Sequence, residues 1–94
     1  MNRLEELYNK VVEATLHASG LTFEQLAICR ADKCVTARVV LVNRLIQLGM
    51  TEGEIVELSG MSQQRVNSLK NSAKYRLKGL SGRLMAEDVE KMTE

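Results

Sequence analysis

Apolar side chains recur every three or four residues along most of the chain, which is the period of an amphipathic α-helix. A first helix is predicted from Asn2, a capping residue, to about Ser19, with Gly20 as its stop. A third helix, also long, is predicted from about Lys33 to Leu48, with Gly49 as its stop. The apolar stripe of the first helix is Leu4, Leu7, Tyr8, Val11 and Thr15, and that of the third is Cys34, Ala37, Leu41, Leu45 and Leu48. We expect the third helix to be the centre of the core.

Two shorter helices are predicted beside these. Thr22 and Gln25 have the spacing of a capping box, so a second helix begins there and ends near Cys29, with Phe23, Leu26 and Ala27 on its apolar side. Near the end of the chain, residues 80–82 look like a break. A short amphipathic helix is then expected over 84–93, with a stripe of Leu84, Met85, Val89 and Met92.

Residues 51–78 have the pattern of a helix-turn-helix. Thr51 and Glu54 form another capping box, and Ile55, Val56 and Leu58 give the first helix its apolar side. Gly60 follows where the chain must reverse through a left-handed backbone conformation, which glycine adopts without steric cost. Ser62 then caps a second helix that reaches Lys78, and Val66, Leu69 and Ala73 mark its inward face.

The outward face of this second helix is polar and basic, with Gln63, Gln64, Asn67, Ser68, Lys70, Asn71 and Lys74. Glutamine and asparagine can pair with adenine in the major groove, while lysine and arginine contact guanine or phosphate. Any solvated helix face has a similar composition, and a helix-turn-helix can also serve protein contacts alone. The capping box, the turn glycine and the surrounding charge together favour the DNA interpretation.

Charge is segregated along the chain although the formal net charge is only +1. Residues 62–83 contain six basic side chains and no acid, and residues 30–44 add four basic side chains against Asp32. The acids gather near both ends and before the turn. Such a two-sided field suits a basic surface that follows phosphates. Glu52 and Glu54 also have a simpler interpretation, as complements to the positive end of their helix dipole.

Composition points to one all-α domain of five to six helices. The 94 residues contain no proline and are rich in helix-forming residues. The longest apolar run, residues 39–42, is far shorter than the roughly 20 residues of a membrane helix, so we expect a cytoplasmic protein without a membrane span.

Chemistry-bearing residues are few. Cys29, Cys34 and the single histidine, His17, make neither a disulfide framework nor a metal set, and His17 has no partner for catalysis. We therefore expect no cofactor, no metal and no enzymatic activity. Both cysteines are interpreted as small buried hydrophobes, with a redox role for the C-x4-C spacing as the alternative.

The order of these parts resembles a known family. From about Val11 to Ala73 the chain is similar to the C-terminal DNA-binding domain of the bacterial replication initiator DnaA, in a group that includes the Trp repressor. Arg30 and Lys33 fall in that family's basic loop, and Ala37-Arg38 matches its Pro-Arg or Ala-Arg dipeptide. Ile55 and Gly60 match its Ile-Gly region and turn. The resemblance implies that Arg30 enters the minor groove and that the second helix of the motif enters the major groove.

The recognition helix departs from that family. The initiators carry Arg-Asp-His-Thr-Thr-Val where this chain has Met-Ser-Gln-Gln-Arg-Val at 61–66, so only the valine is shared. The resemblance therefore implies a fold and a docking mode without the target sequence. The 94 residues also contain no G-x-x-x-x-G-K-[ST] phosphate loop. A standalone regulator of transcription or replication is the function expected.

The predicted DNA-contacting residues lie in the basic loop, at the start of the third helix and on the recognition helix. They are Arg30, Lys33, Arg38, Ser62, Gln63, Gln64, Arg65, Asn67, Ser68, Lys70, Asn71 and Lys74. The expected partner is double-stranded DNA, and a homodimer is compatible with it because many such readers bind paired half-sites. The alternative function is a protein-interaction module that docks through the apolar stripe of the last helix.

Overall fold

The computed structural model describes residues 2–94, which form six α-helices and contain no strand. The helices are α1 (Arg3–Ser19), α2 (Phe23–Ile28), α3 (Asp32–Gln47), α4 (Glu52–Ser59), α5 (Gln63–Arg76) and α6 (Leu80–Met92). The predicted all-α class is thus confirmed. None of these helices combines the length and the apolar character that crossing a membrane requires.

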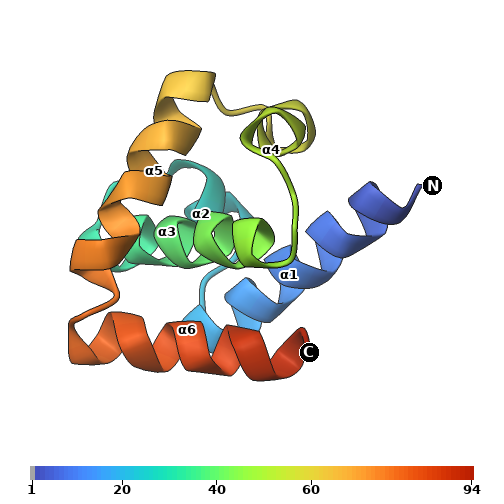
Figure 1. Cartoon of the computed structure of the whole chain (residues 1–94). Helices are drawn as coiled ribbons and strands as arrows, with labels where there is room; N and C mark the ends of the chain where they lie inside the picture. The colour runs from blue at the N-terminus through green and yellow to red at the C-terminus, as the bar shows by residue number, and fades with distance from the viewer. Residues whose placement is uncertain (1) are drawn as a thin grey trace.

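Helix α3 lies at the centre, with α6 along one side and the α4 and α5 pair on the other (Figure 1). Cys34, Ala37, Leu41 and Leu45 are buried as predicted, and Leu48 is half-buried after the helix ends. Further residues of α3 are buried that the single stripe did not include, namely Thr36, Arg38, Val39, Val40 and Val42. Because α1, α2, α5 and α6 all pack against α3, it is covered on more than one face.

Local signals in the sequence define most helix ends. The side chain of Asn2 accepts a hydrogen bond of 2.8 Å from the backbone N–H of Glu5. Both predicted capping boxes are present, and in the second one the Thr51 hydroxyl accepts from Glu54 N–H at 3.2 Å while the Glu54 carboxylate accepts from Thr51 N–H at 2.9 Å. Each box provides acceptors for N–H groups that the helix itself leaves without partners.

The reversal between α4 and α5 is centred on Gly60, as the sequence predicted. Its φ of 78° and ψ of 1° lie in the left-handed region, which residues with a Cβ adopt only at a steric cost. Ser62 then caps α5 by accepting a 3.1 Å hydrogen bond from Arg65 N–H. The short connection fixes how the polar face of α5 sits beside the first turn of α4.

Two details of the prediction were wrong, namely the break before α6 and the apolar side of α2. Residues 80–82 are the first turn of α6 rather than a break, and the interruption lies at 77–79. Gly82 is buried against the end of α5, where a Cβ would collide with the carbonyl oxygen of Arg76. On α2, Phe23 is 64 % exposed and Ala27 is also exposed, because only Leu26 reaches the core.

Candidate nucleic-acid interface

Helix α5 is buried on one narrow face and exposed over the rest. Val66 and Leu69 are buried against α3, while Gln64, Ser68 and Asn71 are exposed. The last three are spaced by four and three residues, which places them on one outward stripe. The stripe has two flanks: Arg65 lies toward the α2–α3 loop, and Gln63, Asn67 and Lys70 lie toward α4. We call these the arginine flank and the Glu52 flank.

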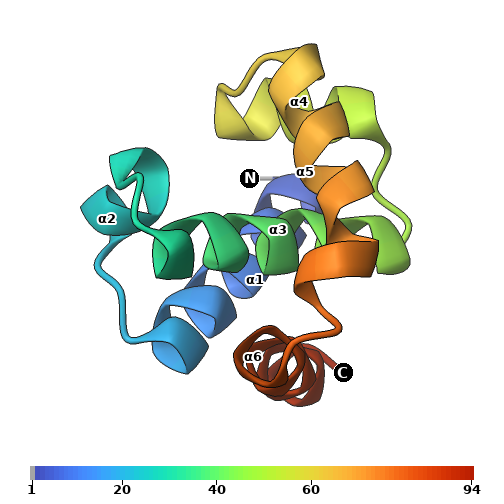
Figure 2. The ribbon, with the colours of Figure 1, turned by 90° about the vertical axis from the view of Figure 1, so that its left-hand side faces the viewer.

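The arginine flank borders an open groove of about 570 Å³ between the α2–α3 loop and α5. These two elements are seen at the left and the right of Figure 2. Arg30, Arg38 and Arg65 all line this groove, and none of its lining residues carries a carboxylate. Lys33, exposed in the first turn of α3, adds a further positive charge nearby. The groove is therefore a site of converging positive charge.

Arg38, which the sequence analysis placed among the DNA-contacting residues, is buried and only 3 % exposed. Its Nε donates to the Leu26 carbonyl at 2.6 Å, and its Nη2 donates to the Cys29 carbonyl. These carbonyls belong to the last turn and the cap of α2, where a cation is favoured by the helix dipole. Arg38 thus fastens α2 and the basic loop to α3.

Arg38 has no ion-pair partner among the described residues, since both of its hydrogen-bond acceptors are neutral carbonyls. Burial lowers the pKa of its guanidinium, and the like charge of Arg65 lowers it further. Arginine nevertheless stays charged at neutral pH. Buried charges in proteins are usually balanced by a counter-charge. Here only the two carbonyl dipoles face the guanidinium.

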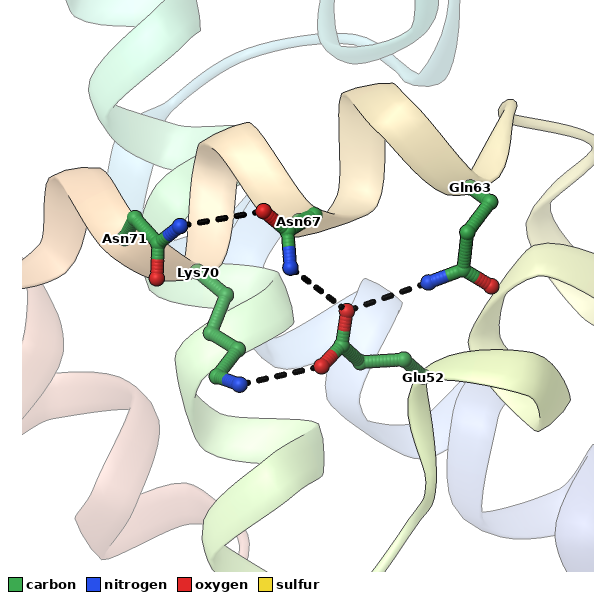
Figure 3. Close-up of polar contacts among 5 residues, drawn as sticks. All are labelled: Glu52, Gln63, Asn67, Lys70 and Asn71. Atoms are coloured by element: carbon green, nitrogen blue, oxygen red, sulfur yellow. Dashed lines mark hydrogen bonds and ion pairs between the residues drawn. The ribbon is translucent and has the colours of Figure 1, made fainter.

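On the opposite flank one carboxylate gathers three donors (Figure 3). Glu52, in the first turn of α4, accepts from Gln63 Nε2 at 3.1 Å and from Asn67 Nδ2 at 3.3 Å on one oxygen. Its other oxygen accepts from Lys70 Nζ at 3.0 Å. Asn71 Nδ2 in turn donates to Asn67 Oδ1 at 3.0 Å. Hydrogen bonding to Lys70, and then to Asn67, lowers the pKa of Glu52.

The Glu52 contacts were missed by the sequence analysis, which treated Glu52 as a complement to the helix dipole. Its partners lie 11, 15 and 18 residues away on another helix, so no local spacing reveals them. As a result Gln63, Asn67 and Lys70 are exposed but already engaged. Lys74 is exposed, and its ammonium lies 5.3 Å from the ring centroid of Tyr75.

Two other cations of the predicted basic regions serve the fold. Arg76 donates to Asp32 at 2.8 Å and to Thr36 at 3.1 Å, which ties the end of α5 to the start of α3. Arg44 donates to the Thr93 hydroxyl at 2.7 Å and so ties α3 to the end of α6. The exposed basic surface is consequently smaller than the count of arginines and lysines suggests.

The cysteines lie beside the arginine flank. Cys34 is buried as predicted, but Cys29 is half-exposed because it caps the end of α2 at the surface. The interaction between the two thiols lowers the pKa of Cys29 and raises that of Cys34. Residues 2–94 contain no cluster of three or more metal-binding side chains.

Comparisons of the chain with protein-family models, with curated proteins and with solved structures found no match.

Proposed function

We propose that this protein binds double-stranded DNA in a sequence-specific manner, with α4 and α5 as a helix-turn-helix and with the Arg30 loop as a second contact. The observation that carries the proposal is the arginine groove. Three arginine residues and no carboxylate-bearing residue line it, directly beside the exposed stripe of α5. Such a groove attracts an anion. Contacts with DNA backbone phosphates also position a bound α-helix so that its side chains reach the base edges.

The two sides of α5 suit the geometry of a major groove. A helix in this groove has base edges ahead of it and a phosphate strand on each side. Gln64, Ser68 and Asn71 then face the bases, and Arg65 with Arg30 faces one strand. Arg38 lies below this surface, where its charge adds to the field of the groove and its hydrogen bonds hold the loop in place.

A salt titration of DNA affinity tests the proposal. Wild-type affinity should fall linearly on a log–log plot against salt, because each phosphate contact releases counterions. Arg65→Ala should reduce the magnitude of the slope by about one and weaken binding to every sequence to a similar extent. Selection of bound sequences from a random duplex pool then returns the preferred site.

Lys91→Ala is the matched control. It removes the same charge from an exposed position on α6, which lies on the side of α3 away from α4 (Figure 1). Its salt slope should equal that of the wild type. A wild-type protein without salt-dependent DNA binding would overturn the proposal, and equal slopes for Arg65→Ala and Lys91→Ala would remove the arginine flank from it.

The alternative, a protein-interaction module, has support at the start of α6. Leu80 is 63 % exposed and Leu84 is 49 % exposed, one helical turn apart. The stripe expected as a docking face is divided, however, because Met85 and Val89 belong to the core. Binding that resists salt and depends on Leu84 rather than Arg65 would favour this alternative.

A further inference from the structure

The hydrogen bonds around Glu52 determine which way the amide groups on α5 point. A carboxylate at neutral pH can only accept hydrogen bonds, so the groups facing it must be donors. Asn67 therefore presents its Nδ2 to Glu52 and its Oδ1 to the other side. That oxygen accepts from Asn71 Nδ2, which leaves Asn71 Oδ1 as the outer end of the relay.

Gln63 is oriented by the same carboxylate. Its Nε2 donates to Glu52, and its amide oxygen is turned away from that contact (Figure 3). The oxygen of Asn71 is likewise turned away from Asn67 in this view. Lys70, the strongest donor of this flank, is held at 3.0 Å from Glu52 Oε2. The contacts with Glu52 and Asn67 therefore hold one N–H of each amide inward and leave the oxygens of Gln63 and Asn71 pointing away.

We infer that Glu52 is a positioning residue that sets base preference by orienting the amide of Asn71 through Asn67. The inference rests on the proposed DNA-binding function. An outward amide oxygen accepts from the N6 amino group of adenine or the N4 amino group of cytosine. Guanine and thymine present the acceptors O6, N7 and O4 at the corresponding major-groove edges, and two acceptors repel. Asn71 thus selects a base with an exocyclic amino group.

The test is selection from a random duplex pool with wild type, Glu52→Gln and Asn71→Ala. The base position read by Asn71 is the one whose preference Asn71→Ala abolishes. At this position the wild type should favour adenine or cytosine over guanine by about tenfold. Glu52→Gln places an amide with both donor and acceptor at the start of the relay. Either orientation then becomes possible, and the preference should fall to about twofold or less.

Glu57→Gln is the matched control, because Glu57 is exposed on the same helix and makes no side-chain hydrogen bond to α5. It removes the same charge, and its base preference should match that of the wild type. An unchanged preference in Glu52→Gln, or an equal loss in Glu57→Gln, would overturn the inference while leaving the proposed function intact. A wild type that selects no sequence would overturn both.

A second measurement uses the wild-type protein alone, so it does not depend on the folding of a variant. The preferred base at the Asn71 position is replaced by an analogue that lacks the exocyclic amino group. Affinity should fall about tenfold, because Asn71 Oδ1 loses its donor. Undiminished affinity for the analogue would show that this oxygen accepts nothing from the base, which would also overturn the inference.

Discussion

The two flanks of α5 differ in how their charged side chains are paired. On the arginine flank three arginine residues line one groove without a carboxylate, and the buried one, Arg38, is held by neutral carbonyls. On the Glu52 flank a single carboxylate receives two amides and an ammonium from the same helix. The first flank has no carboxylate among the residues that line its groove, and the proposed function assigns a DNA phosphate to it. The second is balanced within the chain, so it can orient side chains without adding net attraction.

The largest expected effect follows from breaking the support of the arginine flank. Arg38→Met keeps an apolar stem but leaves the Leu26 and Cys29 carbonyls without their donor. Losing both hydrogen bonds at this buried site should cost about 3 kcal/mol of unfolding free energy. For a domain of this size that corresponds to a drop of roughly 10–20 °C in the thermal midpoint.

Arg83→Met is the control for this prediction. Arg83 is exposed on α6, and its side chain makes no ion pair with the described residues. Its thermal midpoint should stay within about 2 °C of the wild type, as for most surface substitutions. If Arg38→Met and Arg83→Met have the same thermal midpoint, the hydrogen bonds of Arg38 to the two carbonyls contribute nothing to stability. The loop would then be held by other contacts.

A smaller effect is expected from the turn that fixes both flanks relative to α4. Gly60→Val forces a β-branched residue to a φ of 78°, although a Cβ there would meet no other atom within 4 Å. The cost is therefore backbone strain alone, about 1–3 kcal/mol, and it shifts α5 or unfolds it. Circular dichroism melts give the stability, and DNA titration gives the function.

Gly60→Asn sharpens this test, because asparagine tolerates the left-handed region better than other residues with a Cβ. Its loss of stability should be clearly smaller than that of Gly60→Val. Equal losses in the two variants would mean that side-chain size rather than the positive φ matters at this position, contrary to the open space around it.

The smallest effect concerns the pH dependence of the Glu52 flank. Hydrogen bonding to Lys70 and Asn67 holds the pKa of Glu52 below its ordinary value of 4.5. A carboxyl group with a lowered folded-state pKa adds stability that is fully present above 4.5 and is lost as pH falls through the lowered value. The thermal midpoint of the wild type should therefore be higher than that of Glu52→Gln at about pH 7. This difference in midpoint should shrink toward about pH 3. A difference that grows on acidification would contradict the prediction that the ionised Glu52 carboxylate stabilises the fold.

Local sequence signals predicted the helices and many of their ends. Asn2, the two capping boxes and Gly60 act through contacts within four residues, so their effect can be read directly from spacing. The apolar period likewise predicted α3 as the centre of the core. The start of α6 was missed because Gly82 looks like a helix break when the sequence is read without the fold. In the fold a glycine is required there, because a Cβ at Gly82 would collide with the carbonyl oxygen of Arg76 at the end of α5.

The sequence by itself determined an all-α chain, a tight turn at Gly60 and a polar outward stripe on α5. Only the tertiary structure decided which charges are free. Arg38 lies in a basic stretch of the sequence but is buried by contacts 9 and 12 residues away. The Glu52 carboxylate is hydrogen-bonded to partners on α5 that lie up to 18 residues away in the sequence. Helix signals act over one turn and can be read locally. The availability of a charge depends on desolvation and on partners from distant segments, which exist only once the helices have packed.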